Sequence, residues 1–360
     1  MTLTVRLGAR SYPIIVERSY AGVPTRLDAM GFMRVGWVVS HASLLARHGR
    51  GLLGPLRRAG WQLETIPIPE RESSKSLAMA ERLIRRLASR PTRGVPVLIA
   101  FGGGVIGDLA GFVAAIFRRG IPYLQVPTTL LAQVDSAIGG KVGVDLPQAK
   151  NFVGAFYQPR LVWNNVAVLK SLPMRQRRSG VAEIIKYGLI ADAALFELLE
   201  RRLDACLALQ PAVISALIER SCAIKARVVS ADERETRGIR HQLNFGHTIG
   251  HALEAASGYR RWTHGEAIAI GMCAAAALAV ELGLCSRAVP ERLTRVIERA
   301  GLPTRASGVS REAVWGALRY DKKFVRGRPR WVLPRRLGQV IVTEAVPEAR
   351  VRRVLARYVR

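Results

Sequence analysis

The chain is poor in aromatic and in acidic residues, and this limits its partners. Aromatic residues make up 6% of the 360 residues, and 27 Asp and Glu stand against 55 Lys and Arg, for a net charge of +28. The basic residues are spread over the whole length without a nucleic-acid-binding motif, and aromatic residues are too few for base-stacking platforms. We therefore expect no specific nucleic-acid partner. Most of the charge should be solvated surface that steers anions, with a minority binding an anionic substrate.

Cysteines and long apolar runs are also scarce. The four cysteines show no CxxC spacing, which predicts free thiols in a cytoplasmic protein. Residues 1–20 alternate polar and apolar side chains, which predicts a pair of strands and not a signal sequence. The longest apolar run, residues 267–284, is mostly Ala and Gly and contains Glu281. We interpret it as a buried helix, so no membrane association is expected.

The length is sufficient for two domains with buried cores. In residues 1–170, short apolar runs such as 35–40 and 96–101 alternate with helical repeats such as 77–88. This alternation is typical of a doubly wound α/β domain with buried parallel strands. In residues 171–360, long amphipathic stretches predict a mostly helical domain.

Histidine is rare, and four of the six histidines lie between His241 and His264. Histidine is a common ligand of divalent metals and a common proton carrier near neutral pH. On a helix, His247 and His251 would share one face, and His264 could return to the same place from the next segment. A carboxylate would complete a three-ligand catalytic metal site. Core or capping histidines are the alternative, which the clustering disfavours.

A glycine turn follows the apolar run at residues 97–101, with the sequence Gly102-Gly-Gly-Val-Ile-Gly-Asp108. Glycines let the backbone approach a phosphate, and the N-terminus of the next helix offers free N–H groups and the positive end of a dipole. The spacing is not GxGxxG, so this is not the standard dinucleotide fingerprint. We predict phosphate or pyrophosphate binding here, with a simple tight turn as the alternative.

A second glycine-rich stretch runs from Pro127 through Lys141 to Asn151. Lys141, Lys150 and Asn151 are donors suited to phosphate oxygens, and Asp135 is suited to sugar-like hydroxyls. We favour a binding segment over a solvated loop.

Further along the chain, Glu183 and Lys186 stand three residues apart on one helical face. They are either a surface ion pair or the oxygen ligand of the metal with a cation beside it.

Together these segments resemble the 3-dehydroquinate synthase family of the sugar-phosphate cyclase superfamily, from about residue 70 to residue 337. The motifs that carry the resemblance are Gly102-Gly-Gly-Val-Ile-Gly-Asp108, Pro127-Thr-Thr-Leu-Leu-Ala-Gln-Val-Asp135 with Ile138-Gly-Gly-Lys141, Asn151-Phe-Val-Gly-Ala-Phe-Tyr-Gln-Pro159, Ala182-Glu-Ile-Ile-Lys-Tyr-Gly188, Leu243-Asn-Phe-Gly-His-Thr-Ile-Gly-His-Ala252, His264-Gly-Glu-Ala-Ile-Ala-Ile-Gly-Met272 and Asp321-Lys-Lys323.

The resemblance implies an N-terminal α/β Rossmann-like, NAD-binding domain (residues 1–170) and a mostly α-helical, metal- and substrate-binding C-terminal domain (residues 171–360). It implies a carbon–oxygen lyase of the shikimate pathway that uses NAD and a divalent metal ion, zinc or cobalt. Its substrate would be the sugar phosphate 3-deoxy-D-arabino-heptulosonate 7-phosphate, converted into 3-dehydroquinate and phosphate. Transient oxidation by NAD would permit β-elimination of phosphate, and re-reduction and an intramolecular aldol step would follow.

The same resemblance implies roles for individual residues. The metal ligands would be Glu183, His247 and His264, which leaves His251 as a catalytic or phosphate-facing residue. The implied catalytic residues are Lys186, His251, Asp135 and Asn244. The implied substrate-binding residues are Arg119, Lys141, Asn151, Lys225, Arg240 and Lys323. The implied NAD-binding residues are Glu72, Lys75, Gly103, Gly104, Val105, Asp108, Thr128, Thr129, Lys141 and Lys150. A homodimer is implied, with Arg119 reaching a phosphate across the interface.

Three positions depart from the family pattern. His41 and Ser43 stand where Asp or Asn is frequent, the segment 235–240 is one residue longer than usual, and Arg175 replaces a smaller polar residue.

Two alternatives share the fold: a sister cyclase that acts on another sugar phosphate, and a metal-dependent polyol dehydrogenase. Lys225, Arg240, Asn244 and His251 favour a carboxylate-bearing substrate over the first alternative. The phosphate-binding lysines argue against the second. A basic nucleic-acid-binding protein is a third alternative, in which alanine at Glu183 would leave the main activity unchanged.

Overall fold

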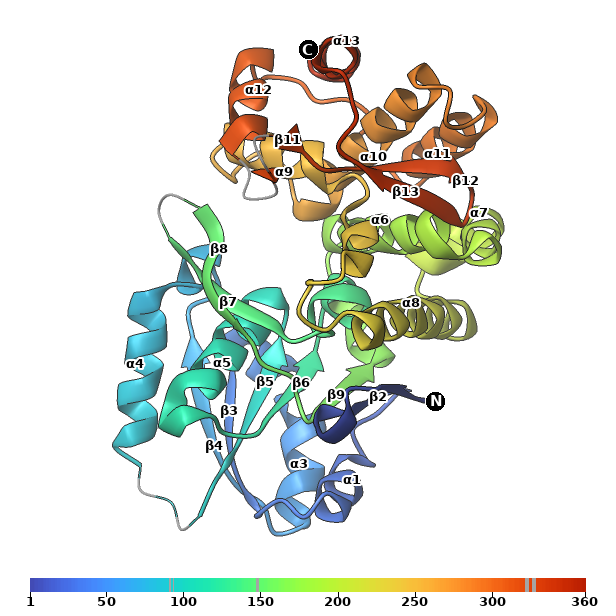
Figure 1. Ribbon diagram of the computed structural model, residues 1–360. Coiled ribbons are helices and arrows are strands. Elements are labelled where there is room, and N and C mark those ends of the chain that lie inside the picture. Colours follow the sequence, from blue (N-terminus) through green and yellow to red (C-terminus); the bar gives the residue numbers. More distant parts are fainter. Residues whose placement is uncertain (91, 93, 147–148, 321–323, 326–327) are drawn as a thin grey trace. The chain divides into compact units, whose positions relative to one another are not determined.

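The computed structural model describes the whole chain except residues 91, 93, 147–148, 321–323 and 326–327 (Figure 1). It divides into two compact units. Unit 1 consists of Met1–Leu172 and Lys225–Arg234, and unit 2 consists of Pro173–Ile224 and Glu235–Arg360. The helix α8 (Pro211–Ala231) therefore contributes residues to both units.

Unit 1 is built on a seven-stranded sheet in the order β1-β2-β9-β6-β5-β3-β4. β1 and β2 pair antiparallel, which confirms the predicted N-terminal strand pair, and the other neighbours pair parallel. The strands are β1 (Thr2–Val5), β2 (Tyr12–Glu17), β3 (Val35–His41), β4 (Gln62–Ile68), β5 (Val97–Gly102), β6 (Tyr123–Pro127) and β9 (Leu161–Asn165).

Helices cover both faces of this sheet because successive side chains of each strand enter two different cores. Leu98 of β5 packs in a core that includes residues of α4 and α5, whereas Ile99 packs in a core that includes residues of α1 and α3. The main helices of the unit are α1 (Val23–Ala29), α3 (Arg50–Arg58), α4 (Leu77–Ala88) and α5 (Gly104–Ile116). Burial on both faces is typical of a doubly wound α/β fold, which confirms the predicted fold of this part of the chain.

The glycine-rich stretch that reaches Asn151 forms a hairpin of β7 (Lys141–Leu146) and β8 (Ala149–Phe156), apart from the main sheet. Gly143 and Gly154 lie opposite each other in it. A Cβ at Gly143 would lie 2.6 Å from the carbonyl oxygen of Val153, so the two strands approach closely because these positions are glycine. The hairpin packs against α5 and α4.

Unit 2 is mostly helical, as predicted. Its helices include α6 (Met174–Ala191), α7 (Ala193–Leu207), α9 (His247–Ala256), α10 (His264–Glu281), α11 (Ala288–Arg299), α12 (Arg311–Tyr320) and α13 (Glu348–Tyr358). Short strands complete it: β10 (Phe324–Val325) pairs with β11 (Arg328–Pro329), and β12 (Trp331–Arg336) pairs with β13 (Gln339–Thr343). α10 packs against α6 and α9; α9 carries His247 and His251, α10 begins with His264, and α6 carries Glu183.

α10 contains most of the longest apolar run of the chain. It is long and apolar enough to cross a bilayer, but 72% of its apolar window is buried inside the protein. Such burial is typical of the core helix of a soluble protein, as predicted for this run.

Candidate functional site

The centre of the histidine cluster is a buried carboxylate on α6. Every residue of this helix from Ser179 to Ile190 is buried, so Glu183 and Lys186 lie in the protein interior despite their charge. They form an ion pair with each other. The interpretation of the pair as an ordinary surface ion pair is therefore wrong, because a surface pair would be solvated.

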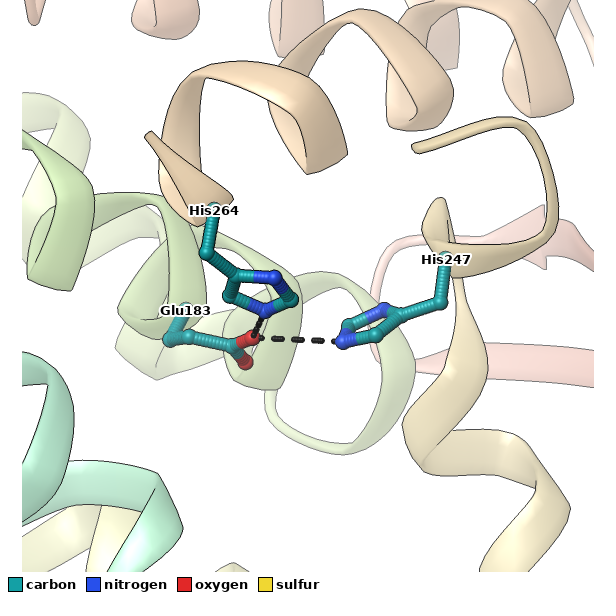
Figure 2. A group of neighbouring side chains, drawn as sticks. All are labelled: Glu183, His247 and His264. Atoms are coloured by element: carbon teal, nitrogen blue, oxygen red, sulfur yellow. Dashed lines mark hydrogen bonds and ion pairs between the residues drawn. The ribbon is translucent and has the colours of Figure 1, made fainter. Parts of the chain in front are cut away.

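Two histidines face this carboxylate from the first residues of two neighbouring helices (Figure 2). Nε2 of His247 lies 3.4 Å and Nε2 of His264 lies 3.3 Å from the same oxygen, Oε1 of Glu183. His247 follows Gly246, which caps the N-terminus of α9 in a left-handed conformation with a φ of +79°. His264 follows Thr263, which caps α10 in a capping box with Glu266. Helix starts thus fix the backbone of both histidines.

The remaining ring nitrogens face acceptors. Nδ1 of His247 lies 3.0 Å from the carbonyl oxygen of Phe245, and Nδ1 of His264 lies 3.4 Å from Oε2 of Glu254. An acceptor at Nδ1 favours the tautomer whose proton is on Nδ1 and whose lone pair is on Nε2. With a metal ion bound, this tautomer would turn the lone pair of each Nε2 toward the ion beside Glu183.

Burial and charge set opposite protonation states for the two rings. Burial, assisted by the charge of Lys186, lowers the pKa of His247 to about 4. Burial also opposes the charge of His264, but its hydrogen bonds with Glu183 and Glu254 outweigh this and raise its pKa to about 10. For Glu183, burial is outweighed by Lys186 and both histidines, which hold its pKa well below the ordinary value.

This donor set fits a divalent metal ion of catalytic type. One carboxylate oxygen and two imidazole nitrogens come within 4.8 Å of one another, the combination that zinc accepts with a further position open. His251 lies beside the set, with its ring centroid 5.2 Å from that of His247. It joins a second possible donor group with Glu254 and His264, so its role as a residue other than a ligand stays a prediction.

Other predicted residues of unit 2 lie in or near η7 (Ile239–Asn244), which packs against α6. Arg240 is buried there and Asn244 ends the segment. The predicted Lys323 lies outside the described residues.

In unit 1, the predicted glycine turn joins β5 to α5. Gly103 caps the helix and Gly104 begins it. A Cβ at Gly103 would lie 3.0 Å from Cγ2 of Thr129, so the turn passes closely over the end of β6. The first N–H groups of a helix have no acceptor within it, and they suit the phosphates of a nucleotide.

Two of the predicted cofactor- and phosphate-binding residues contact Lys75. Nζ of Lys75 lies 2.6 Å from Oδ2 of Asp108 and also donates to Oδ1 of Asn151. Burial alone would lower the pKa of Lys75, but Asp108 outweighs it and the pKa is raised. Lys150 pairs with Glu72 at 2.7 Å. The β7–β8 hairpin thus carries Asn151 and Lys150 to residues 72–75.

Lys225 and Asp135 form a second nearly buried pair in unit 1. Nζ of Lys225 lies 2.7 Å from the backbone oxygen of Asp135 and 2.8 Å from its Oδ1. Asp135 belongs to the π-helical segment η5 (Ala132–Ser136), a local geometry that is frequent at functional sites. Thr128, Thr129 and Lys141 flank this segment, at the end of β6 and the start of β7.

Arg119 lies in a strained turn after α5. Arg118, Arg119 and Gly120 have φ values of +50°, +63° and +123° in succession. Left-handed backbone is unfavourable for a residue with a Cβ, and such strain often marks functional segments.

Two residues near the histidine cluster make contacts that the sequence did not predict. Glu254, which faces His264, was passed over, although it stands three residues after His251 on the same helical face. Arg175 also has an unforeseen role: it binds both oxygens of Glu266 at 2.8 and 2.7 Å, and so holds the start of α10.

Comparisons with known proteins agree with the resemblance. Models of the 3-dehydroquinate synthase N-terminal and C-terminal families match residues 65–179 and 180–324. The 3-dehydroquinate synthase of Nostoc punctiforme is 45% identical over 98% of this chain and 98% of its own. The solved structure of 2-epi-5-epi-valiolone synthase from Streptomyces hygroscopicus, with NAD⁺ and Zn²⁺ bound, is 27% identical with a TM-score of 0.88, and 96% of each chain is covered. A 2-deoxy-scyllo-inosose synthase complexed with carbaglucose-6-phosphate, NAD⁺ and Co²⁺ has a TM-score of 0.86 at 24% identity, over 99% of this chain and 100% of the other, and it supports the fold alone.

Proposed function

Because the chain belongs to the 3-dehydroquinate synthase family, we propose that Glu183, His247 and His264 are the ligands of its catalytic metal ion. The chain is a lyase that converts 3-deoxy-D-arabino-heptulosonate 7-phosphate into 3-dehydroquinate and phosphate, with NAD and a divalent metal ion, zinc or cobalt. The observation that carries the ligand assignment is the convergence of two Nε2 atoms on Oε1 of Glu183.

When bound, NAD would supply reversible hydride transfer, and the metal ion would supply polarisation of the substrate hydroxyl. The protein holds these groups and the anionic substrate. Lys186, Asp135 and Asn244 engage the ring hydroxyls in this proposal. His251 moves a proton in this proposal, because an imidazole nitrogen can either accept or donate one.

The substrate carries a carboxylate and a phosphate, and the proposal gives each a set of cations. Lys225 and Arg240 bind the carboxylate. Lys141, Asn151, His251 and Lys323 hold the phosphate, for which lysine and amide N–H groups are suitable donors. Support comes from the burial of Lys225 and Arg240, because a cation shielded from water attracts an anion more strongly than one at the surface.

NAD is assigned to the glycine turn and its neighbours. The positions are Glu72, Lys75, Gly103, Gly104, Val105, Asp108, Thr128, Thr129, Lys141 and Lys150. The start of α5 would receive the pyrophosphate, and the close approach at Gly103 supports this because a side chain there would meet Thr129.

The domain boundary, location and assembly belong to the same proposal. We assign residues 1–170 to NAD binding and residues 171–360 to metal and substrate binding. We propose a cytoplasmic homodimer in which Arg119 contacts a phosphate of the partner's site. The four cysteines are free, which suits a reducing compartment. The consecutive left-handed residues at Arg118 and Arg119 support a specific role for that turn.

A sister cyclase is not favoured, because the two sister enzymes are 27% and 24% identical to this chain, against 45% for a 3-dehydroquinate synthase.

The test is to incubate metal-loaded protein with NAD⁺ and 3-deoxy-D-arabino-heptulosonate 7-phosphate and to measure phosphate, dehydroquinate and absorbance at 340 nm together. We expect equal release of both products without net NADH. Steady accumulation of NADH would indicate a polyol dehydrogenase instead.

The ligand assignment has its own test. Glu183→Gln should abolish zinc binding and activity, whereas Glu81→Gln, at an exposed i,i+4 pair with Arg85, should change neither. Zinc binding by Glu183→Gln at wild-type affinity would refute the assignment.

A further inference from the structure

Glu254 is a buried carboxylate beside the metal site that the proposed ligand set does not use. It is 7% exposed and lies on α9, one helical turn after His251. Its Oε2 faces Nδ1 of His264 at 3.4 Å, while Nε2 of the same ring faces Glu183. The imidazole ring therefore lies between two carboxylates, one at each nitrogen.

The two sides of the ring have different functions if His264 binds metal. A neutral imidazole carries one proton, and a metal needs the lone pair of Nε2, so the proton must reside on Nδ1. A carboxylate at Nδ1 accepts that proton in a hydrogen bond, fixes the plane of the ring and raises the basicity of Nε2. The position of Glu254 meets this requirement.

His247 provides an internal comparison. Its Nδ1 faces the backbone oxygen of Phe245 at 3.0 Å. Both histidines are therefore oriented by an acceptor at Nδ1, one a neutral carbonyl of the backbone and the other an ionisable side chain. The side-chain acceptor can be removed by substitution, and the carbonyl cannot.

Close packing of α9 and α10 holds Glu254 in place. A Cβ at Gly250 would lie 3.1 Å from Cα of Ile268, so the helices approach with little freedom to shift. The hydroxyl of Ser257 and the backbone N–H of Tyr259 both donate to the carbonyl oxygen of Glu254 near the end of the helix. The carboxylate projects from a rigid turn, which suits an orienting role.

We propose that Glu254 is a positioning residue that selects the metal-binding tautomer and orientation of His264. The inference rests on the proposed assignment of His264 as a ligand. Glu254 acts through His264 and not on the metal itself. The competing arrangement is direct ligation by the group of His251, Glu254 and His264.

The experiment compares zinc affinities of the purified full-length protein by competition with a fluorescent chelator. Glu254→Ala should weaken zinc binding about 10- to 100-fold, the usual effect of losing such a partner. Glu254→Gln keeps an oxygen acceptor of the same shape but loses the charge, so we expect a smaller loss. Glu298→Gln, at an exposed position of α11, is the matched control and should bind zinc normally.

The absorption spectrum of the cobalt-substituted protein separates positioning from ligation. In Glu254→Gln the intensity of the d–d bands should match the wild type, because the number of ligands is unchanged. Band intensities typical of a different coordination number would overturn the proposal in favour of direct ligation by Glu254. Zinc affinities equal to wild type in both variants would refute any role of Glu254 in metal binding. His264→Ala distinguishes failure of the Glu254 proposal from failure of the ligand assignment on which it rests. Normal zinc binding by that variant would refute the assignment of His264 as a ligand. Thermal unfolding of the metal-free Glu254→Gln variant should match the metal-free wild type, which excludes a folding defect.

Discussion

Gly271 allows the two histidine-bearing helices, α9 and α10, to pack closely, and its replacement by alanine tests how closely they must approach. A Cβ at this position of α10 would lie 2.0 Å from the carbonyl oxygen of Gly246 and 2.9 Å from the backbone nitrogen of Gly250. Both obstructing atoms belong to the backbone of α9 or its first cap, so no side chain can rotate away. Since contacts below 3.0 Å are essentially never found for real Cβ atoms, the helices must separate by about 1 Å.

The expected change in the stability of Gly271→Ala follows from two opposing effects. Alanine in a helix is favoured over glycine by about 0.5–1 kcal/mol. Overpacking a buried contact typically costs about 1–3 kcal/mol, and a backbone obstruction places this site at the upper end. The net expectation for Gly271→Ala is a loss of about 2 kcal/mol, or a fall in Tm of about 4–8 °C for a unit of this size. Because the displacement moves His247 away from His264, the affinity for zinc should fall about tenfold or more.

The control is the same substitution at Gly316, in α12, where a Cβ would meet nothing within 4 Å. Gly316→Ala should raise the stability by about 0.5–1 kcal/mol and leave zinc binding unchanged. Differential scanning calorimetry and chelator competition measure both variants. A Gly271→Ala protein as stable as wild type, with unchanged zinc affinity, would refute the close-packing argument.

Three further outcomes are expected. Zinc affinity should rise about tenfold per pH unit between about pH 6 and 8, because one proton must leave His264, whose pKa is raised to about 10. His247, with a pKa of about 4, is already neutral in this range. A zinc affinity independent of pH would contradict this. Lys225→Met removes the ammonium group of the nearly buried ion pair in unit 1. Because a charge-assisted hydrogen bond contributes about 2–3 kcal/mol, kcat/KM should fall about 30- to 150-fold. Steady-state kinetics with the sugar phosphate measure this fall. Arg175→Ala removes the ion pair with Glu266 at the start of α10 and should lower the free energy of unfolding by about 0.5–1 kcal/mol, measured by urea unfolding. No change would mean that the capping box stabilises the start of α10 without the arginine.

The elements that the sequence predicted well are those with a local pattern. The apolar run at 35–40 became β3 and the helical repeat at 77–88 became α4, because alternation and helical spacing report which side chains face a core. The β7–β8 hairpin was not foreseen as strands. Its glycines are required by the approach of one backbone to another, and that approach has no local signature.

For the site, the sequence motifs showed which chemically active residues the chain contains and which family the chain belongs to. The resemblance singled out Glu183, His247 and His264, which the structure brings together, although their roles as ligands await the experiments above. The departure at Arg175 was visible in the sequence, but its reason was not. Its partner Glu266 lies far along the chain, and the pairing depends on how α6 meets α10.

The sequence by itself determined the fold class, the family and therefore the reaction, because the spacing of apolar residues and of chemically distinctive motifs is a local property of the chain. The tertiary structure alone decided which ring nitrogen faces which acceptor, that Lys75 pairs with Asp108, and that Glu254 stands behind His264. These relations arise from the packing of segments remote in sequence, where a shift of about 1 Å decides whether a hydrogen bond forms.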